Sequence, residues 1–305
     1  MLDDIIGYLH RFDSITVAFS GGVDSSVVAA AAQRSGRPCV AVTAKSPAVA
    51  TWQLDLAKQL AAEIGIRHLI TETDEWQRDA YRRNKADRCY HCKQTLYDFL
   101  DAISDGQGGT IVSGTNADDL GDHRPGIRAG RQAGVMTPLA DLGIGKTAVR
   151  QLARLLGLPN ADLPASPCLA SRIAYGVEVT PERLGMVEQA EDWLRKRGWT
   201  ELRVRLHADE LARIEVPSHQ VGSLASLAAE TDLLQSFRQI GFRFVTLDLF
   251  GLTSGSMNQS LVQLEIPGSE TAVDHGSNLS SSPSPSQEPT DFRSRTDQAS
   301  AGDSI

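Results

Sequence analysis

Short apolar segments alternate with longer amphipathic segments through the first half of the chain. Brief apolar runs bounded by small or polar residues are typical of buried strands, and the longer segments repeat their apolar positions at helical spacing. We expect strands at residues 15–19, 38–43, 66–70 and 110–113, and helices at 24–33, 50–64, 91–104 and 146–156. This alternation predicts an α/β domain of Rossmann-like architecture, with a parallel, doubly wound sheet and right-handed crossovers.

The pattern changes after a Gly- and Pro-rich connection at residues 157–167. Further along, we expect helices at 181–197 and 221–240 and strands at 201–206, 212–216 and 242–249. This mixture predicts a smaller C-terminal α+β domain. The expected domain boundaries are therefore 1–160 for the first domain and 161–267 for the second.

Residues 268–305 are rich in Ser, Pro, Asp and Gln and contain almost no hydrophobic side chains. Such a segment buries too little apolar surface to offset the entropy lost on ordering. We predict that this segment is a disordered tail.

The overall composition is that of a water-soluble protein, with 41% hydrophobic residues and no apolar run of membrane-spanning length. The first residues are acidic and lack the basic start of a signal peptide, so we expect a cytoplasmic protein with no membrane partner. The net charge of −8 disfavours a nucleic-acid partner, because phosphate backbones attract a surplus of Lys and Arg.

Residues 20–26, with the sequence SGGVDSS, join the first expected strand to the first expected helix. The two glycines allow the backbone to approach a phosphate, and the helix N-terminus behind them offers free N–H groups and a positive dipole end. A Gly-rich turn capped by Asp24 is the simpler alternative. The position at the carboxyl edge of a strand favours ATP binding. The candidate ligands here are Ser20, Gly21, Gly22, Asp24 and Ser25, with Asp24 also a candidate magnesium ligand.

Four cysteines in a cytosolic chain of this length do not form a disulfide framework. Cys89 and Cys92 form a C-x-x-C at the start of an expected helix, which is compatible with a redox pair, half of a zinc site or chance. Cys168 is a third candidate in the later connection. Cys39 lies within an apolar strand and is interpreted as a small buried hydrophobic residue.

The SGGVDSS segment resembles the signature of the PP-loop ATP pyrophosphatases. A narrower similarity, to LarE-type sulfur transferases, covers residues 2–267 in the order of that family. The segments that carry it are 114–119, 122–126, 167–173, 203–205, 212–215, 246–249 and 255–258.

The resemblance implies an enzyme that cleaves ATP to AMP and pyrophosphate. Enzymes of this family adenylate a carboxylate of a pyridinium dicarboxylate mononucleotide and convert it to a thiocarboxylate, during synthesis of the nickel-pincer cofactor of lactate racemase. The expected cofactors are ATP and Mg²⁺. The expected partners are a small nucleotide substrate, the upstream and downstream enzymes of that pathway, and further copies of the chain in a homo-oligomer.

The resemblance also assigns roles to individual residues. Cys168 corresponds to the sulfur-donating cysteine and Lys93 to an active-site lysine. Further ATP contacts are expected from Gly114 and Thr115, which lie in a segment that carries the resemblance, and from Lys146, whose position at the start of a helix allows it to reach a phosphate. Arg203 and Arg205 are two apart on an expected strand and share one face, which suits a clamp for the substrate phosphate.

The source of sulfur differs within the family. Some members sacrifice the sulfur of a single cysteine and keep dehydroalanine, whereas others hold a [4Fe-4S] cluster on three cysteines. The C-x-x-C favours the cluster version, with Cys89, Cys92 and Cys168 as ligands. Sacrificial donation by Cys168 is the alternative.

Three other functions are compatible with parts of the sequence. A PP-loop tRNA thiolation enzyme is disfavoured by the acidic charge, and an amide-forming ligase of the NAD or GMP synthetase kind does not require three cysteines. A nucleotide-sensing or iron–sulfur scaffold protein without turnover is the non-enzymatic alternative.

Overall fold

The computed structural model describes residues 1–105, 109–121, 125–253 and 255–257. One compact unit spans Met1–Gln263. The tail predicted at 268–305 and motif residues 122–124 lie outside the described residues. Within the described ranges, no helix combines the length and apolar character needed to cross a membrane.

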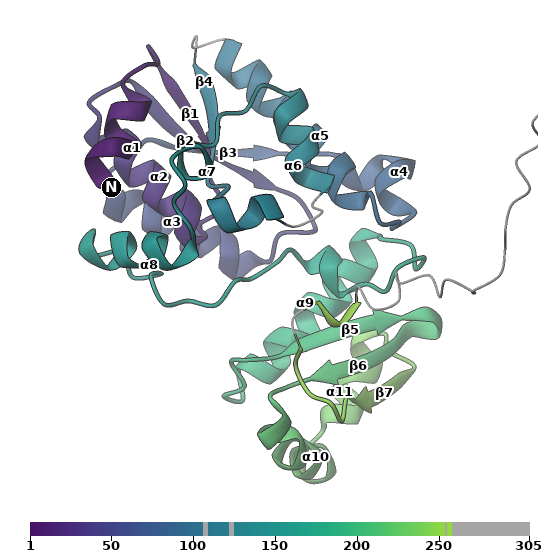
Figure 1. The fold of residues 1–305 in the computed structure, drawn as a ribbon. Helices are drawn as coiled ribbons and strands as arrows, with labels where there is room; N and C mark the ends of the chain where they lie inside the picture. The colour runs from purple at the N-terminus through teal and green to yellow at the C-terminus, as the bar shows by residue number, and fades with distance from the viewer. Residues whose placement is uncertain (106–108, 122–124, 254, 258–305) are drawn as a thin grey trace, which may run out of the picture. The chain divides into compact units, whose positions relative to one another are not determined.

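The first half of the chain contains a four-stranded parallel sheet (Figure 1), as the alternating pattern predicts. Its strand order is β3-β2-β1-β4, and each neighbouring pair is parallel. The strands are β1 (Ile15–Ala18), β2 (Cys39–Lys45), β3 (His68–Glu72) and β4 (Thr110–Ser113). The chain therefore adds strands on one side of β1 and then crosses to the other side, so the topological switch point lies between β1 and β4. Ligands of open α/β sheets bind at the carboxyl end of such a point.

Helices cover both faces of this sheet. One face buries Ile15, Val17 and Val112 against α1 (Leu2–Leu9), α2 (Val23–Arg34), α3 (Thr51–Ile64) and α8 (Lys146–Leu155). The other face buries Val40, Val42 and Ile111 against α5 (Arg88–Asp105) and α6 (Pro125–Gln132). Because both faces are covered, β1, β2 and β4 are buried over most of their length, which made them recognisable in the sequence. The edge strand β3 is only partly buried.

Short helical segments connect these larger elements. They are η1 (Glu75–Gln77), α4 (Asp79–Arg82), η2 (Ala117–Gly121), α7 (Pro138–Asp141) and η3 (Leu169–Arg172). Most residues of the site described below lie in these segments or at the ends of strands and helices.

A second sheet has the order β5-β6-β7, with an antiparallel pair followed by a parallel pair. Its strands are β5 (Arg203–His207), β6 (Leu211–Glu215) and β7 (Phe244–Leu247), and its helices are α9 (Pro181–Arg195), α10 (Val221–Glu230) and α11 (Leu233–Ile240). Short η4 (Ala208–Glu210) and η5 (Ser218–Gln220) complete the elements. The boundary predicted at residue 160 stays a prediction.

The single helix predicted over 221–240 is wrong, because the chain breaks into α10 and α11. Thr231 adopts an extended conformation at the end of α10. Asp232 then starts α11, where its side chain accepts a hydrogen bond from the Ser236 hydroxyl at 2.9 Å. Asp favours helix starts, so this local preference ended the longer apolar pattern.

Candidate functional site

The phosphate loop lies between β1 and α2 and is held by its own serines. The Ser25 and Ser26 hydroxyls both donate to the carbonyl of Gly22, at 2.9 and 3.0 Å. The Ser20 hydroxyl lies 3.3 Å from that of Ser25. Gly21 has φ +73°, and a Cβ there would lie 3.1 Å from the Ala57 backbone, so a glycine is required. The first turn of α2 thus presents its free N–H groups at the switch point of the sheet.

A charged pair stands beside this loop. The Lys146 ammonium, at the start of α8, lies 2.5 Å from a carboxylate oxygen of Asp24. The other carboxylate oxygen of Asp24 accepts a hydrogen bond from the Asn116 side chain at 3.1 Å. Both charged side chains are partly exposed, at 33% for Lys146 and 22% for Asp24. A cation and a carboxylate are therefore accessible next to the helix N-terminus.

Gly114 and Thr115 follow β4 and reach the same loop from the neighbouring strand. A Cβ on Gly114 would lie 2.5 Å from the backbone nitrogen of Ser25, far closer than atoms approach. The backbone at the end of β4 therefore packs directly on the first turn of α2. The Thr115 hydroxyl lies 3.1 Å from that of Ser113.

Two polar residues that support the loop were not predicted. The Asn160 side chain is 1% exposed and donates to the Gly21 carbonyl at 2.9 Å and to the Ser26 hydroxyl at 3.0 Å. The Asp118 carboxylate accepts a hydrogen bond from the Lys146 backbone nitrogen at 2.7 Å, which caps α8 from a distance. Asp118 lies in a segment that the family resemblance had marked, but nothing local in the sequence marks Asn160.

Cys89, Cys92 and Cys168, which we call the thiol centre, come from two distant segments. Cys89 and Cys92 lie in the first turns of α5, and Cys168 directly precedes η3. Cys89 is exposed, whereas the other two are half-buried and pack against one hydrophobic cluster. Burial, with a further contribution from the nearby Cys168, raises the pKa of the Cys92 thiol to about 12. The fold therefore brings these thiols into one electrostatic neighbourhood.

Two basic residues flank the thiol centre. Burial acts to lower the pKa of Lys93, but Tyr97, Cys92 and Cys168 outweigh it and the pKa lies above its usual value. The Lys93 side chain forms no hydrogen bond with the described residues. Arg88 is 5% exposed, and its guanidinium donates to the Asn84 side chain and to the Ala170 carbonyl at 2.8 Å.

A second buried arginine fixes the segment that carries Cys168. Arg172 is 1% exposed and donates to the Cys168 carbonyl at 3.0 Å and to the Pro167 carbonyl. Its Nε donates to the Glu191 carboxylate at 3.1 Å, and Glu191 is fully buried. The backbone on both sides of Cys168 is therefore held by guanidinium groups.

The thiol centre does not fit a metal cluster as it stands. Among the residues that the structure describes, no group of three or more His, Cys, Asp or Glu side chains is arranged to hold a metal ion. The predicted [4Fe-4S] ligand set is thus not assembled in this structure.

Arg203 and Arg205 lie two apart on β5, as predicted, but their surroundings differ. Arg205 is 7% exposed and makes two hydrogen bonds to one oxygen of Glu215, at 2.8 and 3.0 Å, and a third to the Ser171 carbonyl at 3.1 Å. Arg203 has no carboxylate partner within the described part of the chain. Burial, followed by repulsion from Arg172, lowers the pKa of Arg203 to about 10. Arg203 is therefore the less compensated of the two cations.

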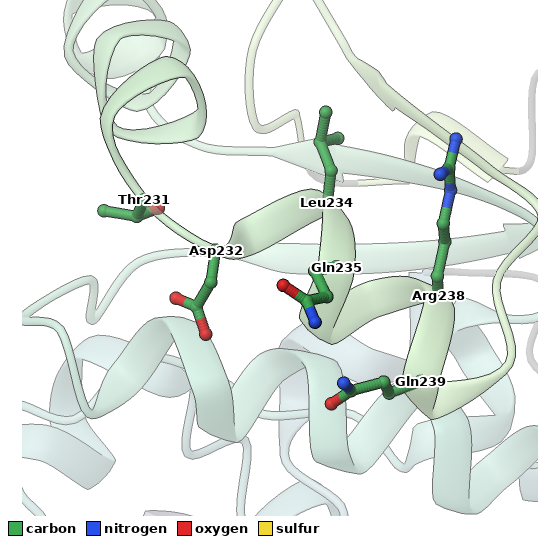
Figure 2. Close-up of a pocket in the computed structure, with 6 residues that line it drawn as sticks. All are labelled: Thr231, Asp232, Leu234, Gln235, Arg238 and Gln239. Atoms are coloured by element: carbon green, nitrogen blue, oxygen red, sulfur yellow. The ribbon is translucent and has the colours of Figure 1, made fainter.

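A hollow of about 720 Å³ lies along α11 and the turn before it. Figure 2 shows its lining residues, which are Thr231, Asp232, Leu234, Gln235, Arg238 and Gln239. All six are exposed, and none belongs to the phosphate loop, the thiol centre or the arginines of β5. It is a surface depression, unlike the concave, largely apolar sites that enclose small ligands.

The fold and the loop at its switch point define a nucleotide-binding α/β protein of the PP-loop class. The Asparagine synthase family matches residues 9–99. An uncharacterized protein of Synechocystis sp. is 42% identical over 264 residues, which are 86% of this chain and 98% of that protein. The NMN synthetase from Francisella tularensis has a similar structure, with a TM-score of 0.45 and 19% identity over 54% of this chain and 74% of that chain.

A further relative is the pyridinium-3,5-bisthiocarboxylic acid mononucleotide synthase of Lactiplantibacillus plantarum. It is 36% identical over 265 residues, which are 86% of this chain and 95% of that enzyme. The chain belongs to the family of this synthase, the LarE-type branch of the PP-loop proteins. The expectation drawn from the motifs is confirmed at the level of the family.

Proposed function

We propose that this protein is an ATP-dependent sulfur transferase that converts a carboxylate of a pyridinium dicarboxylate mononucleotide to a thiocarboxylate, as a step in nickel-pincer cofactor synthesis. The observation that carries the proposal is the 36% identity to a pyridinium-3,5-bisthiocarboxylic acid mononucleotide synthase along 95% of that enzyme. The phosphate loop and the thiol centre supply the two kinds of chemistry that such a reaction needs.

In the first half-reaction, a carboxylate oxygen of the substrate attacks the α-phosphorus of ATP. The bond between the α-phosphorus and the bridging oxygen breaks, and pyrophosphate leaves with the electron pair. The N–H groups of the phosphate loop and the Lys146 ammonium stabilise the negative charge of the phosphates. Asp24 supplies the carboxylate oxygen that a magnesium ion prefers, and bound magnesium would neutralise charge on the leaving pyrophosphate.

In the second half-reaction, the Cys168 thiol loses its proton to solvent and its sulfur attacks the acyl carbon. AMP leaves with its electron pair, and a thioester joins the substrate to the protein. Loss of the Cys168 α-proton to water and cleavage of the Cβ–Sγ bond then release the thiocarboxylate and leave dehydroalanine. Lys93 is suited to neutralise the oxyanion that forms at the acyl carbon.

The substrate phosphate is assigned to Arg203. Among the residues that the structure describes, its guanidinium has no carboxylate partner, so an incoming phosphate would supply the compensation that Arg203 lacks. Arg205 remains paired with Glu215 and supports the same face of β5. We expect Arg203→Ala to weaken substrate binding and leave ATP binding unchanged.

The test of this function measures both half-reactions in anaerobically purified protein. With ATP and the pyridinium dicarboxylate mononucleotide, we expect release of pyrophosphate, a thiocarboxylate product by mass spectrometry, and a Cys168 peptide lighter by one H₂S. Pyrophosphate release that needs no substrate, or formation of an amide in its place, would refute the proposal.

An iron–sulfur cluster held by the three cysteines is the alternative source of the transferred sulfur. This alternative requires the three thiols to rearrange. Iron and acid-labile sulfide analysis of the anaerobic protein, beside a Cys89→Ala variant, separates the two versions. Sacrificial donation predicts one sulfur per chain with or without Cys89. A cluster predicts several sulfurs per chain and their loss in Cys89→Ala.

We also propose a cytoplasmic homo-oligomer that exchanges its substrate and product with other enzymes of the cofactor pathway. The resemblance to the LarE-type enzymes supports this proposal. Light scattering on a sizing column measures the oligomeric state, and a mass equal to the 32.9 kDa chain would contradict it.

A further inference from the structure

The side chain of Gln53 joins two parts of the molecule that serve different halves of the proposed reaction. Gln53 lies in the first turn of α3, directly after the connection from β2. Its amide oxygen accepts a hydrogen bond from the Ala50 nitrogen at 3.3 Å, and its amide nitrogen donates to the Ser166 carbonyl at 2.9 Å. The first bond caps the helix. The second bond reaches a residue two positions before Cys168 and contributes nothing to the helix.

The segment before Cys168 has few means of fixing its own position. Residues 162–165 and Pro167 are exposed. Two of the residues in this segment are prolines, which have no N–H group to donate, so the segment is held mainly through its carbonyl groups. Arg172 in η3 binds the Pro167 carbonyl. Gln53 binds the neighbouring Ser166 carbonyl and so attaches the segment to the four-stranded sheet.

The connection between β2 and α3 also holds the residue after Cys168. The Leu169 nitrogen donates to the Ala48 carbonyl at 2.8 Å. Leu169 is 2% exposed and Ala48 is 3% exposed, so this hydrogen bond is shielded from water. Cys168 therefore lies between two attachments, at Ser166 and at Leu169, to one short stretch of chain.

The helix that carries Gln53 also touches the phosphate loop. Ala57 lies one turn later on the same face of α3, and a Cβ on Gly21 would lie 3.1 Å from its Cα. The start of the helix is fixed from α9, because the Glu188 carboxylate accepts a hydrogen bond from the Thr51 nitrogen at 2.6 Å. One anchored helix thus contacts the phosphate loop with one turn and holds the segment before the sulfur donor with the turn before it.

We propose that Gln53 is a positioning residue for sulfur transfer: its amide N–H holds the Ser166 carbonyl and thereby places the Cys168 sulfur beside the carboxylate that is adenylated at the phosphate loop. The inference rests on the proposed function and deepens it. Gln53 acts through the main chain of Ser166 rather than on a reacting atom. It serves only the second half-reaction, because the first takes place at the phosphate loop and involves no sulfur.

Gln53→Glu separates the two hydrogen bonds of this amide. A glutamate keeps an oxygen that can cap α3, and Glu is favourable at this position of a helix. It has no N–H group to donate, so the Ser166 carbonyl loses its partner. A merely structural role in capping the helix therefore predicts two normal half-reactions. Gln189→Glu is the matched control, because Gln189 is exposed on α9 and its amide donates to the Gly185 carbonyl at 3.1 Å.

In single-turnover experiments, we expect Gln53→Glu to release pyrophosphate at the wild-type rate and to form thiocarboxylate about 10- to 100-fold more slowly, because a misplacement of about 1 Å can cost about 100-fold in rate. Gln189→Glu should match the wild type in both steps. Wild-type thiocarboxylate formation by Gln53→Glu, or equal slowing of both steps, would overturn the inference.

A measurement without substrates decides whether Gln53 fixes the Cys168 segment, even if the proposed function fails. Hydrogen–deuterium exchange with peptide mass spectrometry reports the Leu169 amide, which is bonded to Ala48 in the protein alone. We expect exchange in the peptide that contains residues 166–171 to be about 2- to 10-fold faster in Gln53→Glu, the factor that corresponds to one hydrogen bond. Gln189→Glu should exchange like the wild type.

Gln53→Met removes both hydrogen bonds of the amide and provides the same measurement should the glutamate variant fail to fold. We expect it to accelerate exchange in residues 166–171 at least as much as Gln53→Glu. Wild-type exchange in this peptide in either Gln53 variant would show that the amide does not hold the segment, and would overturn the inference.

Discussion

Replacing Gly114 by alanine tests how the sheet supports the phosphate loop. The added Cβ would meet the Ser25 nitrogen at 2.5 Å, the Asp24 carbonyl carbon at 2.8 Å and the Ser25 Cα at 2.9 Å. All three are backbone atoms of the first turn of α2, so no side chain can rotate away. Carbon and nitrogen atoms pack at about 3.5 Å or more, so the end of β4 and the helix start must separate by roughly 1 Å.

Overpacking of this size costs about 1–3 kcal/mol of stability. Displacement of the helix start also misdirects its N–H groups, and the loss of one or two hydrogen bonds to a charged phosphate costs about 1.5–3 kcal/mol each. ATP affinity should therefore fall by at least about tenfold. Isothermal titration with a non-hydrolysable ATP analogue measures the affinity, and circular dichroism confirms that the variant is folded at the assay temperature.

Gly7→Ala is the matched control for this substitution. Gly7 lies within α1, and an added Cβ there meets no atom within 4 Å. Alanine is favoured over glycine in a helix by about 0.5–1 kcal/mol, so this variant should be slightly more stable and bind ATP normally. If Gly114→Ala bound ATP within twofold of the wild type, the close contact between β4 and α2 would not be what positions the loop.

Three further predictions concern other parts of the site. Glu215→Gln leaves the buried Arg205 without its charge partner and should lower the free energy of unfolding by about 3–5 kcal/mol. Urea denaturation measures this loss, and an unchanged transition midpoint would contradict it. The raised pKa keeps the Cys92 thiol protonated at pH 8, so iodoacetamide should label the exposed Cys89 first. Labelling of Cys92 should become faster as the pH approaches about 12. Equal labelling rates of the two cysteines at pH 8 would show that burial does not raise the pKa of Cys92. Asn160→Ala removes both hydrogen bonds to the loop and should lower the free energy of unfolding by about 1–3 kcal/mol and weaken ATP binding. A variant with unchanged stability and normal ATP affinity would show that the loop keeps its conformation without Asn160.

The sheet and the phosphate loop were predictable because their signals are local. Each predicted strand of the first sheet overlaps an observed one. The signal is clearest for β1, β2 and β4, because a buried parallel strand has few exposed polar positions. The loop was recognisable because its glycines stand directly between a strand and a helix, where a backbone can approach a phosphate closely. The break at Asp232 was missed, because apolar spacing continued across a residue whose own preference is to start a helix.

The support of the site was not predictable, since it depends on contacts between distant segments. The pairing of Arg205 with Glu215 places a predicted phosphate ligand in a structural ion pair, and no spacing rule relates strand partners before the register is known. Asn160 lies far in sequence from the loop atoms that its side chain binds. Local patterns identify residues that are able to bind a ligand or take part in a reaction. The tertiary fold decides which of these side chains remain free to do so.

The hydrogen bonds that fix residues 168–170 are made to main-chain atoms. Arg88 binds the Ala170 carbonyl, Arg172 and the Ser171 hydroxyl bind the Cys168 carbonyl, and the Leu169 nitrogen binds the Ala48 carbonyl. The sulfur atom carries none of these anchors. A chain that has given up its sulfur would accordingly keep its shape after one reaction, and would persist as an intact but spent reagent that still binds ATP and competes with fresh copies for substrate.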